Sequence, residues 1–195
     1  MNLYQSEDGA RESALVKYVH NVLDALGCRH GPSHAEVMWL DGDDEPCLVE
    51  VGCRPHGGEG TFVQMVTPIV GYSQVSVMLD AVEKPYRFHR LPERPERFEG
   101  GCVEVCLIAH QEGLLSALPG LHLVRALQSY HSEEIKATIG EHIPLTVDFL
   151  TTPGSIMLVH SDKRQLTKDI DYIHQLCKDG LMTILPANRL RLRSF

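Results

Sequence analysis

Apolar and polar positions along the first part of the chain predict a helix followed by a hairpin. Between Ala10 and Leu26 apolar residues recur at spacings of three and four, which indicates an amphipathic helix with Asp8 as its N-cap. Two short apolar segments, residues 34–40 and 46–52, flank the turn-forming cluster Asp41-Gly42-Asp43-Asp44. An antiparallel hairpin with its tip at this cluster is therefore expected.

The pattern becomes helical again from Thr61 to Val82, and Pro68 and Gly71 are expected to divide this stretch into two helices. Residues 84–97 hold three prolines among charged residues, which is typical of a linker. The predicted organisation is a first domain over residues 1–97, a second over residues 98–187 and a basic tail over residues 188–195.

The remainder of the chain alternates short apolar stretches with turns, which favours a small, sheet-rich unit. The stretches read as strands are residues 102–109, 121–128, 145–150, 156–160 and 181–185. A helix is predicted over about Leu166 to Lys178, with one face formed by Ile170, Ile173, His174 and Cys177.

Composition narrows the classes of function. Hydrophobic residues make up 43% of the chain and charged residues 23%, which is ordinary for a globular protein. The net charge of -8 argues against a nucleic-acid partner, and no apolar run approaches the roughly 20 residues that span a bilayer, so no membrane association is expected. The six cysteines form no C-x-x-C pair and are read as reduced thiols of a cytoplasmic protein.

The predicted hairpin places two carboxylates opposite each other. With a turn centred on Asp43, Glu36 faces Glu50 across the strands, and their Cβ atoms lie roughly 5 Å apart on one face. The opposite, buried face is expected to carry Ala35, Val37, Trp39, Cys47, Val49 and Val51. Two opposed carboxylates repel each other, and a bound cation, Mg²⁺ or Mn²⁺ for hard oxygen ligands, is one way to compensate. Ordinary solvated glutamates on an amphipathic hairpin are the other interpretation.

Residues beside this pair suggest an anion site. Arg54 follows Glu50 by four positions, so on a continuing strand it points to the same face, either as a clamp for a phosphoryl oxygen or as a salt-bridge partner of the glutamates. His34 lies on that face too, as a ligand contact or a structural residue. Gly57 and Gly58 serve a turn or let bare backbone approach a ligand closely.

Three segments in this order and spacing resemble the end of an ATP-grasp domain: Ala25-Leu26-Gly27, residues 31–37, and residues 48–58, which read Leu-Val-Glu-Val-Gly-Cys-Arg-Pro-His-Gly-Gly. Within that superfamily the chain is most similar to carboxylate–amine ligases of the L-amino-acid ligase and carnosine synthase type. The resemblance covers the C-terminal half of these proteins. It implies an α+β fold in which the C-terminal part of an ATP-grasp domain (helix, antiparallel hairpin, two helices) precedes a small sheet-rich domain.

The resemblance also implies roles for individual residues. Glu36 and Glu50 match the metal-binding acids, and Arg54 matches the catalytic arginine that steadies the phosphates and the acyl-phosphate intermediate, with Gly57 and Gly58 beside the cofactor. The implied cofactors are ATP and Mg²⁺ or Mn²⁺, and the implied substrate is a small amino or carboxylic acid. Many members read Glu-x-Asn-x-Arg, whereas Gly52 replaces the asparagine here, so one side-chain metal ligand is absent.

Two functions stay open at this point. The chain is either the metal- and phosphate-binding half of an ATP-dependent C–N ligase, incomplete or inactive in isolation, or a non-catalytic binding or assembly module derived from one. The ATP-binding lobe of the family has no counterpart in the sequence. A missing N-terminal lobe or a second copy of the chain is therefore the expected protein partner.

Overall fold

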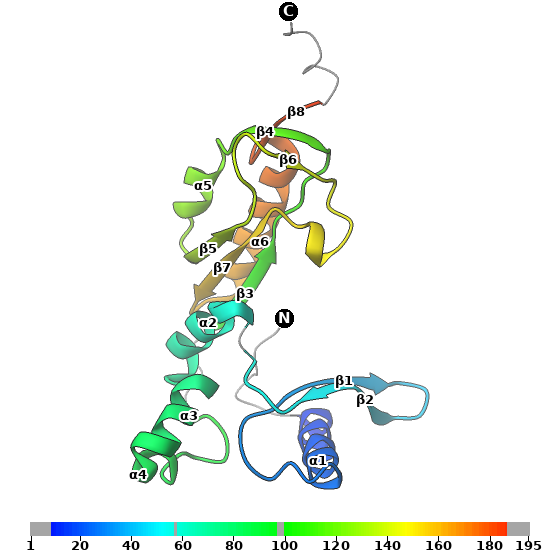
Figure 1. Ribbon diagram of the computed structural model, residues 1–195, viewed down its shortest axis with the longest axis vertical. Helices are drawn as coiled ribbons and strands as arrows, with labels where there is room; N and C mark the ends of the chain where they lie inside the picture. Colours follow the sequence, from blue (N-terminus) through cyan, green and yellow to red (C-terminus); the bar gives the residue numbers. More distant parts are fainter. Residues whose placement is uncertain (1–8, 57, 97–99, 187–195) are drawn as a thin grey trace, which may run out of the picture. The chain divides into compact units, whose positions relative to one another are not determined.

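Near residue 98 the chain divides into two units, an N-terminal unit within residues 4–98 and a C-terminal unit within residues 99–195. The computed structural model describes residues 9–56, 58–96 and 100–186 (Figure 1). The predicted cap Asp8, Gly57 and the basic tail lie outside the described residues.

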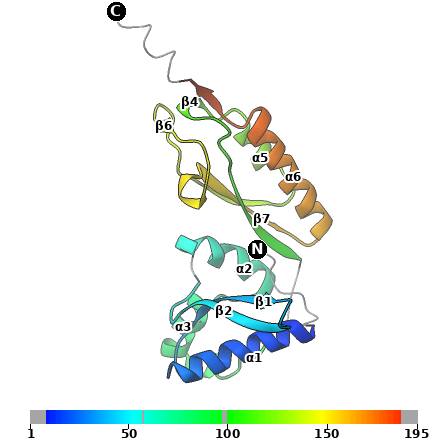
Figure 2. The ribbon, with the colours of Figure 1, turned by 90° about the vertical axis from the view of Figure 1, so that its right-hand side faces the viewer.

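The N-terminal unit begins with α1 (Ala10–Ala25), which lies along the hairpin of β1 (His34–Leu40) and β2 (Glu45–Gly52) (Figure 2). Gly9 occupies the N-cap position and makes no side-chain hydrogen bond there. The Tyr18 hydroxyl of α1 accepts a hydrogen bond from the Leu48 N–H at 3.2 Å. Near the hairpin tip, Arg11 pairs with Asp41 at 3.2 Å and its guanidinium lies 5.1 Å from the centre of the Trp39 ring. Helix and hairpin are therefore joined along their length.

After the hairpin, η1 (Gly58–Gly60) leads into α2 (Thr61–Val70), α3 (Gln74–Glu83) and the four-residue α4 (Pro85–Phe88). The two predicted helices are present, but α2 continues through Pro68 and ends at Gly71, whose φ of 91° is the left-handed conformation that glycine adopts readily. Ser73 and Ser76 form a capping box that starts α3. The stretch predicted as a linker begins with α4, because a proline fits the first turn of a helix.

Among the described residues, no single helix has the length and hydropathy of a membrane span. Only the pair α2 and α3, which is bent by 80°, reaches them jointly.

The C-terminal unit contains two three-stranded antiparallel sheets (Figure 1). The first has the order β3 (Gly101–Cys106), β7 (Gly154–His160), β5 (Tyr130–Ile135), and the second the order β6 (His142–Ile143), β4 (Gly113–Ala117), β8 (Thr183–Leu185). The helices are α5 (Leu121–Arg125), α6 (Lys163–Asp179) and the short η2 (Phe149–Thr151). Helices and antiparallel sheets together confirm the predicted α+β class.

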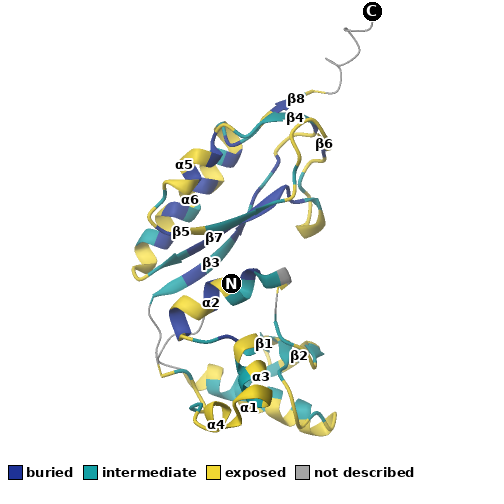
Figure 3. Cartoon of the chain, turned by 60° about the vertical axis from the view of Figure 1, so that its left-hand side comes forward, coloured by how far each residue is buried: buried dark blue, intermediate teal, exposed yellow. Residues whose placement is uncertain are grey.

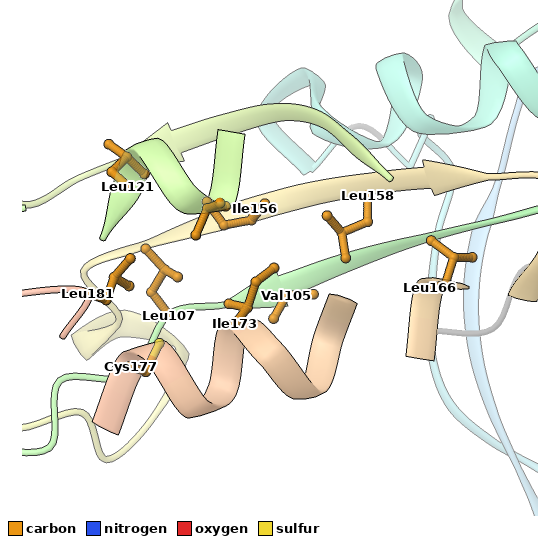
Figure 4. Close-up of a cluster of buried hydrophobic side chains, with 10 residues drawn as sticks. Val105, Leu107, Leu121, Ile156, Leu158, Leu166, Ile173, Cys177 and Leu181 are labelled. Carbon is orange, nitrogen blue, oxygen red and sulfur yellow. The ribbon is translucent and has the colours of Figure 1, made fainter. Parts of the chain in front are cut away.

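The core of this unit lies between α6 and the first sheet. Figure 4 shows Leu166, Ile173 and Cys177 of α6 beside Ile156 and Leu158 of β7, and all five are buried. Burying each such aliphatic side chain contributes roughly 1.5–3 kcal/mol, so this cluster accounts for much of the stability of the unit.

Two predictions for the C-terminal unit were wrong. Residues 121–128 contain the helix α5, because Leu121 and Val124, the buried positions, are three residues apart and share a helix face but not a strand face. Residues 145–150 form no strand and end in η2, where Asp148 caps the turn through Thr151. The helix predicted over about Leu166 to Lys178 is present as α6, on which Ile173 and Cys177 are buried, His174 is exposed and Asp169 is buried.

Candidate functional site

The hairpin pairs Glu36 with Glu50, as the sequence predicts, but not for the predicted reason. Towards the tip, Leu40 pairs with Glu45 and Val37 with Leu48, so the turn is centred between Gly42 and Asp43. Between the Val37–Leu48 pair and the Glu36–Glu50 pair the register shifts by one residue, and Val49 is the extra residue of a β-bulge. The turn therefore lies before the predicted centre at Asp43, and the extra residue in β2 restores the predicted pairing of Glu36 with Glu50.

The bulge also changes which residues share a face. Trp39 and Val37, which were predicted on the buried face, are half-buried and are paired with half-buried Pro46 and Leu48. Cys47 and Val49, predicted on the buried face, are exposed. A one-residue insertion reverses the alternation on one side of the bulge, so the assignment of these two residues to the apolar face is a mistake.

Glu36 and Glu50 are both exposed on the face opposite the apolar one. Arg54 lies next to this face, since a Cβ atom added to Gly52 would meet its Cγ at 3.4 Å and its Nε at 3.5 Å. The Arg54 guanidinium donates a hydrogen bond to the Pro55 carbonyl oxygen at 3.2 Å. Within the described part of the chain, no ion pair joins Arg54 to either glutamate. The Arg54 side chain thus lies beside Gly52, and its guanidinium forms no ion pair with either glutamate among the described residues.

An aromatic cluster borders the carboxylate pair. The imidazole rings of His34 and His56 stack with centroids 4.2 Å apart, and Phe62 of α2 contacts His56 edge-on at 4.4 Å. His34 therefore packs on a second histidine, which favours a structural role for its ring, and no pattern in the sequence indicates this stack.

Gln74 is a further residue that sequence reasoning missed. Its Oε1 accepts a hydrogen bond from the His56 N–H at 2.7 Å, and its Nε2 donates one to the Ser33 carbonyl oxygen at 2.9 Å. Gln74 is the first residue of α3, so this amide ties the loop after Arg54 and the start of β1 to one helix end. Its place after the N-cap Ser73 offered no hint of this role.

Cysteines connect the other side of the loop. The Cys28 thiol, just after α1, forms a hydrogen bond with the Cys53 thiol, and this bond, followed by burial and by the charge of Cys53, raises the pKa of Cys28. Cys53, the residue before Arg54, therefore lies close to the end of α1.

Gly58 adopts a left-handed conformation (φ 47°), and its carbonyl oxygen accepts a hydrogen bond from the Thr61 hydroxyl at 2.6 Å. A Cβ atom on Gly58 would lie 2.8 Å from that hydroxyl oxygen, so the position requires glycine for local geometry. Gly57, the other predicted cofactor residue, lies outside the described residues.

A metal centre made by the protein alone is not found in the described ranges. Among residues 9–56, 58–96 and 100–186, no three His, Cys, Asp or Glu side chains converge to hold an ion. Two hard carboxylates on one strand pair suit Mg²⁺ only where other oxygens, such as those of a nucleotide phosphate, complete its shell.

The fold of the chain is that of part of the ATP-grasp ligases. No protein-family model and no curated protein sequence matches the chain. Several solved structures match the chain, and at the level of the fold they confirm the resemblance of the sequence to ATP-grasp proteins.

The chain is similar to the L-amino acid ligase from Bacillus licheniformis, with 23% identity and a TM-score of 0.70 over 94% of this chain and 43% of that one. The phosphoribosylglycinamide synthetase from Anaerococcus prevotii gives 12% identity and a TM-score of 0.69 over 95% of this chain and 44% of that one. The N5-carboxyaminoimidazole ribonucleotide synthetase from Thermotoga maritima gives 18% identity and a TM-score of 0.57 over 95% of this chain and 45% of that one. The chain spans less than half the length of each.

Proposed function

We propose that the chain forms the metal- and phosphate-binding part of an ATP-dependent carboxylate–amine ligase that acts through an acyl phosphate on a small amino or carboxylic acid. In this proposal Glu36 and Glu50 bind Mg²⁺ together with nucleotide phosphates, and Arg54 contacts the phosphoryl oxygens. The observation that carries it is the direct opposition of the two exposed glutamates in a fold shared with ATP-grasp ligases.

The chemistry of the residues fits this role. Mg²⁺ typically takes one or two carboxylates and fills its remaining positions with water and substrate phosphates. When bound, it neutralises charge on the phosphates. Glu36 and Glu50 orient the ion, and the Arg54 guanidinium offers hydrogen-bond donors to a phosphate oxygen. Phosphoryl transfer depends mainly on such positioning and charge stabilisation.

Gly52 gives the proposal a test by gain of binding. The space beside its backbone contains the aliphatic part of Arg54, at the ordinary contact distance of 3.4 Å from a built Cβ. Gly52→Asn therefore fits with little rearrangement and adds an amide oxygen next to Glu50, where the resembled family carries its asparagine ligand. The substitution is expected to strengthen metal binding.

The decisive experiment is a titration of Mn²⁺ into the full chain with ADP present, with free Mn²⁺ followed by electron paramagnetic resonance. Glu50→Gln is expected to weaken Mn²⁺ binding at least 10-fold, and Gly52→Asn to strengthen it several-fold. Glu45→Gln is the matched control, because Glu45 is an exposed carboxylate on the same strand, roughly 17 Å further along. Equal affinity for wild type, Glu50→Gln and Glu45→Gln would refute the metal assignment.

A non-catalytic binding module is the second candidate function. It is favoured by the lack of a three-ligand metal cluster in the described residues. It predicts that Mn²⁺ and ADP bind no better to the chain than to Glu36→Gln, and that ATP is not hydrolysed in the presence of mixed amino acids.

A further inference from the structure

Two cysteine thiols are in contact beside the loop of the candidate site. The thiol of Cys28, just after α1, forms a hydrogen bond with the thiol of Cys53, which lies between β2 and Arg54. Both are free thiols; Cys28 is half-buried and Cys53 is exposed. A dissolved reagent can therefore reach the pair.

The course of α1 along the hairpin also brings these two residues together. Near the start of α1, Arg11 pairs with Asp41 at the hairpin tip, and further along the Tyr18 hydroxyl accepts a hydrogen bond from the Leu48 N–H. Helix and second strand therefore run in the same direction. From Tyr18 to its end the helix rises roughly 10 Å, which is the length of about three residues of strand. The end of α1 is thus expected beside the last residues of β2, directly before Cys53.

Both cysteines follow directly on regular elements. Gly27 adopts the left-handed conformation (φ 69°), and the Cys28 N–H donates a hydrogen bond to the Leu23 carbonyl oxygen at 2.9 Å, as is typical of a helix C-terminus. Gly52, the residue before Cys53, is the last paired residue of β2. The contact between the thiols is therefore set by the fold of α1 and the hairpin.

A covalent link at this place would constrain elements that have little packing of their own. All residues of α1, β1 and β2 are half-buried or exposed (Figure 3). A two-stranded sheet is only marginally stable without further strands or a well-packed helix. A bond between the end of α1 and the end of β2 would thus change the mobility of the loop that follows.

We propose that Cys28 and Cys53 form a reversible disulfide when a hydroperoxide oxidises them, and that this bond fastens the loop of Arg54 to α1. A disulfide needs Cβ atoms within roughly 3.5–4.5 Å, which two thiols already in contact reach by side-chain rotation and small backbone shifts. The inference does not rest on metal or nucleotide binding.

The reaction balances with hydrogen peroxide as the oxidant. The sulfur of the exposed Cys53 attacks one peroxide oxygen, the O–O bond breaks, and Cys53 becomes a sulfenic acid while one water leaves. The hydrogen bond to Cys53, followed by burial, raises the pKa of Cys28, so this thiol stays protonated and reacts second. Its sulfur attacks the Cys53 sulfur, the S–O bond breaks, the S–S bond forms, and the Cys28 proton leaves with the hydroxide as a second water.

Peroxide treatment of the full chain tests the proposal. Remaining thiols are alkylated with N-ethylmaleimide, and peptides are analysed by mass spectrometry without reduction. A peptide cross-linked through Cys28 and Cys53 is expected as the main product, and dithiothreitol is expected to remove it. Cys47 is the internal control, since it is exposed on β2 but lies roughly 20 Å from Cys53 along the strand, and it should take part in no cross-link.

Matched serine variants separate a pair from two independent thiols. In Cys28→Ser, the sulfenic acid of Cys53 has no thiol to react with, so dimedone, a reagent for sulfenic acids, is expected to label Cys53 about 10-fold more than in the wild type. Cys47→Ser, the same change at another exposed cysteine, should leave the Cys28–Cys53 cross-link unchanged.

Hydrogen–deuterium exchange measures the effect on the loop. Oxidation is expected to slow exchange of the Arg54 amide about 10-fold in the wild type and to leave it unchanged in Cys53→Ser. Three results would overturn the proposal: no cross-link between Cys28 and Cys53, cross-links to Cys47 as frequent as those to Cys53, or equal exchange of the Arg54 amide before and after oxidation. The measurements need no metal or nucleotide, so they succeed or fail separately from the proposed Mn²⁺ binding.

Discussion

Replacing Asp169 with alanine tests the buried carboxylate that ties α6 to the segment entering β5. Asp169 is 4% exposed, and its Oδ2 accepts hydrogen bonds from the N–H and the hydroxyl of Ser129, at 3.2 Å and 2.6 Å. Its Oδ1 accepts a third from the Gln165 side chain at 2.9 Å. Ser129 is 0% exposed, so its donors have no access to water once the carboxylate is gone.

The magnitude follows from the donors that lose their acceptor. Each buried, unsatisfied donor costs about 1–3 kcal/mol, and Ser129 contributes two of them, while the half-buried Gln165 turns to solvent. Removing the charge also removes its desolvation cost. We therefore expect Asp169→Ala to lower the free energy of unfolding of the C-terminal unit by about 2–4 kcal/mol.

Urea unfolding followed by circular dichroism measures this loss. Asp171→Ala is the matched control, since Asp171 is exposed on the same helix two residues away and should change the stability by less than about 0.5 kcal/mol. Adding Ser129→Ala to Asp169→Ala should recover part of the loss, because one orphaned donor disappears. Equal stability of the Asp169 and Asp171 variants would show that the buried network contributes nothing.

Two further predictions concern a thiol and the loop of the candidate site. Burial raises the pKa of Cys102 from 9.0 to about 12, so the stability that its protonated form contributes is complete below pH 9 and is lost as the pH rises towards 12. Iodoacetamide at pH 8 should label the exposed Cys47 long before Cys102, as read by mass spectrometry. Early labelling of Cys102 would contradict its burial. Gln74→Ala should speed hydrogen–deuterium exchange of the His56 amide about 10-fold, whereas Gln74→Glu, which keeps the side-chain oxygen that accepts from this amide, should not. Identical exchange in both variants would show that this hydrogen bond does not hold the loop.

The sequence predicts the helices of the N-terminal unit well because their signals are local. Ser73 supplies a cap, Gly71 a left-handed end, and the apolar spacing of α1 is helical over its whole length. These signals act within a few residues, so a chain without its partners already displays them.

The strands of the C-terminal unit are harder to predict because neighbours define them. β5 reads Tyr-His-Ser-Glu-Glu-Ile and shows little apolar alternation, yet it pairs with β7, the central strand of its sheet. The more apolar stretch at residues 145–150 is no strand, since Thr151 and Asp148 bind the backbone locally. Pairing with β7 makes β5 a strand despite its polar sequence, and local side-chain hydrogen bonds keep residues 145–150 from forming a strand despite their apolar sequence.

In the hairpin of the candidate site, one part of the strand pairing follows from the sequence and another part does not. Alternation can be counted from the tip or from the Gly52 end, and the bulge at Val49 makes the two counts disagree by one residue. The register of the Gly52 end, when it is carried past the bulge towards the tip, misplaces Cys47 and Val49 on the apolar face. The Gly52 end is regular, and Glu50 and Gly52 follow each other there on one face with Arg54 beside them. The proposed metal and phosphate groups all lie on that side of the bulge, so their relative placement does not depend on the turn that the sequence left undetermined.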